Sequence, residues 1–183
     1  MRKAFIVAVM VLATVPAGPA AFAEDTVCRG TIGAVSVDSV IVPRGATCVL
    51  EGTMVGGNVD VRRGATLVAT GVTVDGNVTG DRAAAVSISG STIGGRVQVT
   101  KGGSGEVLDS AVTGDVVFVE NRGAVEATGN VIGGSLQADR NRGGVTIADN
   151  EIQNNLQCSE NNPPPAGGNN TVGGQKSGQC AAL

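Results

Sequence analysis

Carboxylates and cations are the main side chains of this sequence that could take part in chemistry, because it contains no His, Trp or Tyr. Hydrolysis of a sugar chain needs two acids at a fixed separation on one face. Asp109 and Asp149 occupy positions where equivalent segments of the chain carry Gly, which indicates a conformational role. Asp does not recur at one position often enough to form a ladder of Ca²⁺ sites. We therefore expect no catalytic site, metal or cofactor. If the protein is an enzyme, its candidate acids are Asp60, Asp75, Asp81, Asp109, Asp115 and Asp149.

Basic side chains recur at a fixed interval. Arg44, Arg63, Arg82 and Lys101 are evenly spaced along the chain. If a repeating fold stacks them near 5 Å, they repel one another by roughly 1 kcal/mol per pair in water, and a bound linear polyanion such as a uronate chain would offset this repulsion. The alternative is that Arg and Lys occupy exposed turns and pack their alkyl stems on apolar neighbours. Both interpretations remain open at this point.

The cations recur because the whole sequence repeats. Apolar residues return at a period of roughly 20 residues, as in solenoid proteins. They alternate with other residues at period two, which is typical of strands and not of helices. One such column reads Val40, Val59, Val78, Val97, Val116, Leu136 and Leu156. A second reads Val42, Val61, Gly80, Val99, Phe118, Ala138 and Cys158.

Turn residues recur in the same register. Two columns hold only Gly, Asn or Asp, the residues that tolerate a left-handed backbone. The first reads Gly52, Gly71, Gly90, Asp109, Gly129, Asp149 and Asn169, and the second reads Gly57, Gly76, Gly95, Gly114, Gly134, Asn154 and Gly174. A looser third corner reads Gly45, Gly64, Ala83, Gly102, Asn121, Asn141 and Asn161.

The repeat predicts an all-β, single-stranded parallel β-helix. Each repeat is one coil with three short strands and three turns, and about seven coils are expected. A left-handed hexapeptide helix would show sub-repeats of a third of a coil, which are absent, so we favour the right-handed form. The inner face of each coil is covered only by its neighbours.

The chain divides into four predicted segments: a signal peptide (1–23), an N-terminal cap (24–39), the coils (40–162) and a C-terminal cap (163–183). Arg2 and Lys3 precede a short apolar run, and Ala21-Phe22-Ala23 is a small-x-small cleavage site. The run is shorter than the roughly 20 residues that span a membrane. We therefore expect a secreted or cell-envelope protein, cleaved near Ala23, with no integral membrane segment after cleavage.

Four cysteines lie at the two ends of the repeat. An even number in an exported chain suggests disulfides, and neither a CxxC motif nor a His is present to suggest a metal or redox site. Of the three possible connectivities we predict Cys28–Cys48 and Cys158–Cys180, because stacked Cα atoms near 5 Å satisfy disulfide geometry. The other pairings would join opposite ends of the rod. These bridges are expected to cap the coil.

The coil pattern resembles the parallel β-helix of the pectin-lyase-like superfamily. The strings Asn155-Leu156-Gln157-Cys158, Asn170-Thr171-Val172-x-Gly174 and Gly178-Gln179-Cys180 resemble the ending of small secreted bacterial β-helix proteins. The superfamily resemblance implies lyases, hydrolases and adhesins that handle polysaccharides. Its lyases use carboxylates with Ca²⁺ and a Lys or Arg base, in a cleft between large loops. The coils here are nearly minimal, and a fold alone does not give a function.

We expect an exported structural or cell-surface interaction protein, monomeric and without an evident catalytic site. The first alternative is a binder of cell-surface or extracellular anionic polysaccharide through Arg44, Arg63, Arg82 and Lys101. A polysaccharide lyase or hydrolase is the other alternative. A net charge of −3 gives no support for nucleic-acid binding.

Overall fold

The computed structural model describes residues 25–183, which form β-strands and no helix. The strands build three parallel sheets that share one axis. Sheet A contains β1 (Asp25–Val27), β4 (Ser39–Val42), β7 (Val59–Val61), β10 (Val78–Asp81), β13 (Val97–Thr100), β16 (Val116–Val119), β19 (Leu136–Asp139), β22 (Leu156–Ser159) and β25 (Lys176–Gly178).

The other two sheets complete each coil. Sheet B contains β2 (Thr31–Ile32), β5 (Thr47–Glu51), β8 (Thr66–Thr70), β11 (Ala85–Ser89), β14 (Ser104–Leu108), β17 (Val125–Thr128), β20 (Val145–Ala148) and β23 (Ala166–Gly168). Sheet C contains β3 (Ser36–Val37), β6 (Met54–Val55), β9 (Thr73–Val74), β12 (Thr92–Ile93), β15 (Ala111–Val112), β18 (Val131–Ile132), β21 (Glu151–Ile152) and β24 (Thr171–Val172).

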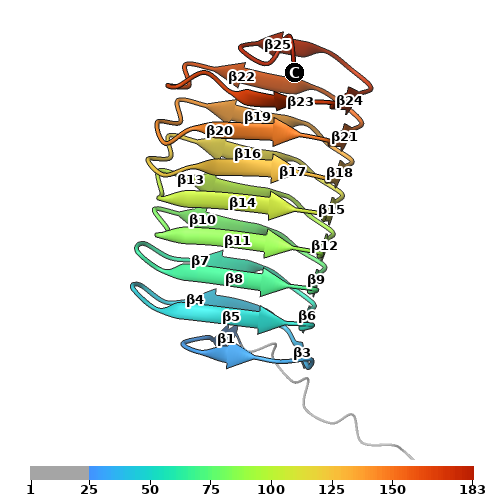
Figure 1. Ribbon diagram of the computed structural model, residues 1–183. Coiled ribbons are helices and arrows are strands. Elements are labelled where there is room, and N and C mark those ends of the chain that lie inside the picture. Colours follow the sequence, from blue (N-terminus) through green and yellow to red (C-terminus); the bar gives the residue numbers. More distant parts are fainter. Residues whose placement is uncertain (1–24) are drawn as a thin grey trace, which may run out of the picture.

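The predicted parallel β-helix is confirmed. In Figure 1 the near strands, such as β5, run left to right, the far strands, such as β7, return, and the chain climbs from blue to red. This winding is right-handed. Neighbouring coils pair residue by residue in parallel register; Val78, for example, lies between Val59 and Val97.

Side chains alternate between the interior and solvent along each strand. In β7, Val59 and Val61 are buried and Asp60 is exposed. The same inward positions are occupied by aliphatic residues in most coils, and Phe118 is the largest fully buried side chain. Each buried aliphatic contributes about 1.5–3 kcal/mol relative to an exposed one, so the stack of coils supplies the core that no single coil possesses.

The coil continues into both segments that the sequence assigned to caps. Strands β1–β3 pair with β4–β6, and β23–β25 pair with β20–β22. The two eight-stranded sheets give about eight coils, where the sequence predicted about seven. The repeat does not reveal the first coil because its spacing is irregular. Thr26 pairs with Val40 and Ile32 with Leu50, and these two intervals differ from each other and from those of the later coils.

One of the two predicted left-handed corners is confirmed and the other is wrong. All seven residues of the column from Gly52 to Asn169 have φ between 47° and 70°. No residue of the column from Gly57 to Gly174 has a positive φ. Close stacking explains glycine there, because a Cβ on Gly95 would lie 2.7 Å from the backbone oxygen of Gly76.

Buried polar ladders support two of the corners. The amide of Asn121 donates to the backbone oxygen of Val99 at 2.9 Å, and its oxygen accepts the N–H of Gly102 at 3.0 Å. The pattern is repeated down one ladder by Asn141 and Asn161, and a second buried ladder consists of Ser91, Ser110, Asn130, Asn150 and Asn170. These side chains satisfy backbone groups that the turns would otherwise leave unpaired.

Both predicted disulfides are present. Cys28–Cys48 and Cys158–Cys180 join adjacent coils at the two ends, with Cα–Cα distances of 5.5 and 5.2 Å. Residues 25–183 include no helix with the length and hydropathy of a membrane-spanning segment. The predicted signal peptide (1–23) lies outside the described residues.

Candidate functional site

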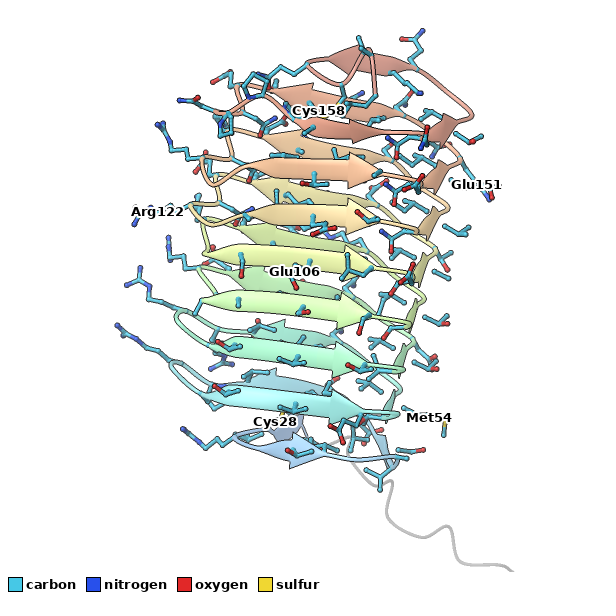
Figure 2. All side chains as sticks on the ribbon, in the orientation of Figure 1. Cys28, Met54, Glu106, Arg122, Glu151 and Cys158 are labelled. Atoms are coloured by element: carbon cyan, nitrogen blue, oxygen red, sulfur yellow. A yellow bond between two sulfur atoms is a disulfide. The ribbon has the colours of Figure 1, made fainter. Side chains whose placement is uncertain are left out.

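The predicted cation column follows one long edge of the coil, where the chain turns from sheet A to sheet B. Figure 2 shows Arg122 projecting from this edge, whereas Met54 and Glu151 project from the opposite side. Six basic side chains line two grooves here, and together we call them the basic edge: Arg63, Arg82, Lys101, Arg122, Arg140 and Arg142.

The two grooves adjoin one another. The first has a volume of about 590 Å³ and brings together three of the four predicted residues, Arg63, Arg82 and Lys101. The second has a volume of about 290 Å³ and is lined by Arg140 and Arg142. Glu120 and Arg122 line both grooves. The two grooves therefore form one open track along the coil axis, which we call the basic track.

Arg44, the fourth predicted residue, does not line this track. The backbone of the column is not uniform either, although this difference does not separate Arg44 from Arg63. In the second and third coils the left-handed residue is a glycine, Gly45 or Gly64, that follows the basic residue. From Arg82 onward the charged residue itself is left-handed.

Charged residues hold left-handed conformations in five consecutive coils. Their φ values lie between 52° and 58° at Arg82, Lys101, Glu120, Arg140 and Glu160. A long L-residue in this conformation costs about 1–2 kcal/mol relative to an ordinary one. The column from Gly52 to Asn169 uses only Gly, Asp and Asn for the same geometry. The column from Arg82 to Glu160 therefore places long charged side chains in a conformation that the other column gives to short residues.

The turns that carry these charges are fixed from beneath. Asn121 and Asn141 are fully buried directly after Glu120 and Arg140. The amide of Asn141 donates to the backbone oxygen of Phe118 at 2.9 Å, and its oxygen accepts the Asn121 N–H at 3.0 Å. The charged side chains therefore extend from rigid backbone, which reduces the entropy lost on binding a ligand.

The basic edge is only partly neutralised. Arg82 pairs with Asp81 at 3.4 Å and Arg140 with Glu120 at 3.2 Å, through side chains that are about half exposed. Exposed pairs of this kind contribute about 0–1 kcal/mol. Within residues 25–183, no carboxylate forms an ion pair with the other four cations: Arg63, Lys101, Arg122 and Arg142. Six cations thus face one groove acid, in a chain whose net charge is −3.

A third groove lies over the outer face of sheet A, with a volume of about 500 Å³. It shares Lys101, Glu120 and Arg140 with the basic track, so these three residues form the ridge between them. Val117 lies in register between Gln98 and Gln137 on its floor. The Val117 side chain can pack against a sugar ring, and the amides of Gln98 and Gln137 can hydrogen-bond the hydroxyl groups of the sugar.

None of the six candidate acids lines the two grooves of the basic edge, although Asp81 pairs with Arg82. Asp60 pairs with Arg62, which is outside both grooves. Asp109 and Asp149 are left-handed corner residues, as predicted, and Asp115 accepts the backbone N–H of Ser135 at 2.7 Å. Asp75 lies elsewhere, in a groove of about 400 Å³ that it shares with Asp38. Among the described residues, the lining of the two grooves of the basic edge therefore includes one acid, Glu120, and no acid pair.

The described residues contain no cluster of three or more His, Cys, Asp or Glu that could hold a metal ion. Comparison of the chain with protein-family models, with curated proteins and with solved structures found no match.

Proposed function

We propose that this protein is an exported, non-catalytic interaction module whose basic edge binds an extended anionic polysaccharide. The observation that carries the proposal is the concentration of six basic side chains around one track, against a single acid that already pairs with Arg140. Charges of one sign gathered along a groove raise the local concentration of an oppositely charged ligand.

The shape of the site favours a long chain over a small ligand. Adjacent coils are about 4.8 Å apart, the spacing between paired strands, so a polymer that runs along the axis meets a new cation at each coil from Arg63 to Lys101. Because both grooves are open, the chain can continue beyond them. The amides of Gln98 and Gln137 lie across the ridge and suit the hydroxyl groups of sugars.

Export is supported by two independent features. The sequence pattern of residues 1–23 is that of a secretory signal. The two disulfides persist in oxidising compartments and are rare in the cytosol. An extracellular or cell-surface polysaccharide is therefore the polyanion that the protein would meet.

A purely structural role is the second candidate. Disulfides at both ends, Cys28–Cys48 and Cys158–Cys180, hold the terminal coils to the rod. Coils closed in this way resist the end-to-end pairing that exposed strand edges promote. They suit a stiff extracellular spacer that needs no ligand.

Affinity electrophoresis of the protein through gels that contain neutral or anionic polysaccharide separates these candidates. We expect retardation by the anionic polymer that weakens at high salt, because salt screens exposed charges. The retardation should be lost in the triple variant Arg63→Gln, Arg82→Gln, Lys101→Gln. A control variant with the same change in net charge outside the track, Arg29→Gln, Arg62→Gln, Lys176→Gln, should retain it. Absence of retardation by every polymer would leave the structural role.

A further inference from the structure

Glu120 is an acid that lies among the cations of the basic track. It is the one acid among the charged residues that line the first two grooves, and it lines the third as well. In the repeat it lies one coil after Lys101 and one coil before Arg140, with a left-handed backbone at all three positions. The order of charges along the edge is therefore positive at Arg63, Arg82 and Lys101, negative at Glu120, and positive again at Arg140.

We propose that Glu120 divides the basic track into two anion subsites, so that the ligand is a polysaccharide whose charged residues are interrupted by neutral, hydroxyl-bearing ones. This inference rests on the proposed polysaccharide binding and names the class of polymer. The first subsite is centred on Arg63, Arg82 and Lys101, and the second on Arg142. Arg122 lines both grooves, so it contributes to both subsites.

The chemistry of a carboxylate at this point explains the selection. A ligand anion seated at Glu120 would face a like charge at about one coil spacing, which weakens binding about five-fold, the equivalent of about 1 kcal/mol. A sugar hydroxyl at the same place donates a hydrogen bond to the carboxylate instead. The polymer that fits best therefore places a neutral residue over Glu120 and negative residues on either side.

The pairing with Arg140 strengthens this discrimination. The Arg140 guanidinium lies 3.2 Å from the Glu120 carboxylate, so one of the track's cations is already engaged at the dividing point. A uniformly charged polymer would have to compete with that pair. An interrupted polymer leaves it intact and uses the four cations that have no acid partner within residues 25–183: Arg63, Lys101, Arg122 and Arg142.

Two labelled oligosaccharides of equal length test the proposal by fluorescence anisotropy. One is hyaluronan, in which a uronate alternates with a neutral N-acetylhexosamine, and the other is polygalacturonate, in which every residue is a uronate. In Glu120→Gln we expect affinity for polygalacturonate to rise about five-fold and affinity for hyaluronan to rise less than two-fold. Release of Arg140 favours polygalacturonate, because only the uniformly charged polymer competes for this cation, so it moves the ratio of the two dissociation constants in the same direction as removal of the Glu120 charge.

Glu160→Gln is the matched control. Glu160 is also left-handed, lies in the same column and carries the same charge, but it lines none of the three grooves. We expect it to leave both affinities unchanged. A ratio that does not change in Glu120→Gln, or that changes equally in Glu160→Gln, overturns the inference and leaves polyanion binding standing. If the native protein binds neither oligosaccharide, the proposed function itself fails.

Discussion

Asn141 lies one coil beyond Asn121, and its side-chain oxygen accepts hydrogen bonds from both the backbone N–H and the side-chain amide of Asn121, each at 3.0 Å. Its own amide donates to the backbone oxygen of Phe118 at 2.9 Å. One buried side chain therefore fixes the turn of its own coil against the turn of the coil before it. This connection is the physical basis for the rigidity of the turns that carry Glu120 and Arg140.

Replacement of Asn141 by Leu should destabilise the protein by about 3 kcal/mol, because buried donors on Asn121 lose their acceptor at about 1–3 kcal/mol each. The measurement is the free energy of unfolding from denaturant titration. Asn58→Ala provides the comparison, since Asn58 makes similar contacts to Asn77 but is exposed. Its cost should be below about 1 kcal/mol. Equal costs would contradict a special role for the buried ladder.

Glycines in the two predicted corner columns should respond differently to substitution. A Cβ on Gly95 would lie 2.7 Å from the Gly76 backbone oxygen, whereas a Cβ on Gly90 meets nothing within 4 Å. We expect Gly95→Ala to cost about 1–3 kcal/mol through overpacking. Gly90→Asn should stay within about 0.5 kcal/mol, because Asn accepts the left-handed φ that Asn169 already adopts in that column. Thermal unfolding of the two variants distinguishes steric from conformational glycine.

Phe118 and Gly105 form a complementary pair in the core. A Cβ on Gly105 would meet the Phe118 ring at 3.0 Å, so the glycine provides the volume that the ring occupies. Gly105→Val should cost about 1–3 kcal/mol, and the addition of Phe118→Leu should recover part of that cost. A double-mutant cycle measures this coupling. Strict additivity of the two substitutions would show that the ring and the glycine do not compete for space.

The terminal disulfides should act locally. Cys158–Cys180 closes a loop with a sequence separation of 22, for which loop-closure entropy gives about 3 kcal/mol. After replacement of both cysteines by Ser, we expect faster amide exchange at β25 and little change at β13 and β16, because each coil contacts mainly its neighbours. Cys28→Ser with Cys48→Ser is the control, and it should affect β1 instead. Uniform acceleration along the rod would contradict the local model.

Much of the fold is predictable from the sequence because every coil repeats the same constraints. Inward aliphatic columns and the left-handed corner at Gly52 recur often enough to predict the strands and register of every coil after the first, and both disulfides. The sequence does not show why a particular residue type is present at an individual position. Gly57 and Gly52 are the same letter in the sequence, yet one avoids a clash and the other supplies a positive φ.

The candidate site is predictable as a column of charges but not as a surface. The spacing of Arg63, Arg82 and Lys101 indicates their stacking, and the structure places them in one groove. The contribution of Arg122 depends on the turn of the later, longer coils, in which a cation comes shortly after the left-handed residue. The columns of apolar residues do not reveal the different turn of these coils. The Asn-Arg pair that recurs at 121–122 and 141–142 is the sequence feature that indicates it.

We expect the lysine at position 101 to lower the free energy of unfolding of the protein. Its φ of 55° is unfavourable for a long side chain, whereas Asn accepts this conformation more readily. Lys101→Asn is therefore expected to raise the free energy of unfolding by about 0.5–1 kcal/mol and to weaken retardation by anionic polysaccharide. Arg44→Asn is the matched control, because Arg44 lies in the same column without a positive φ and outside the track. It should change neither property.

A fall in the stability of Lys101→Asn would mean that the lysine is retained for its packing. A gain in stability together with weaker binding is the signature of a residue retained for a ligand.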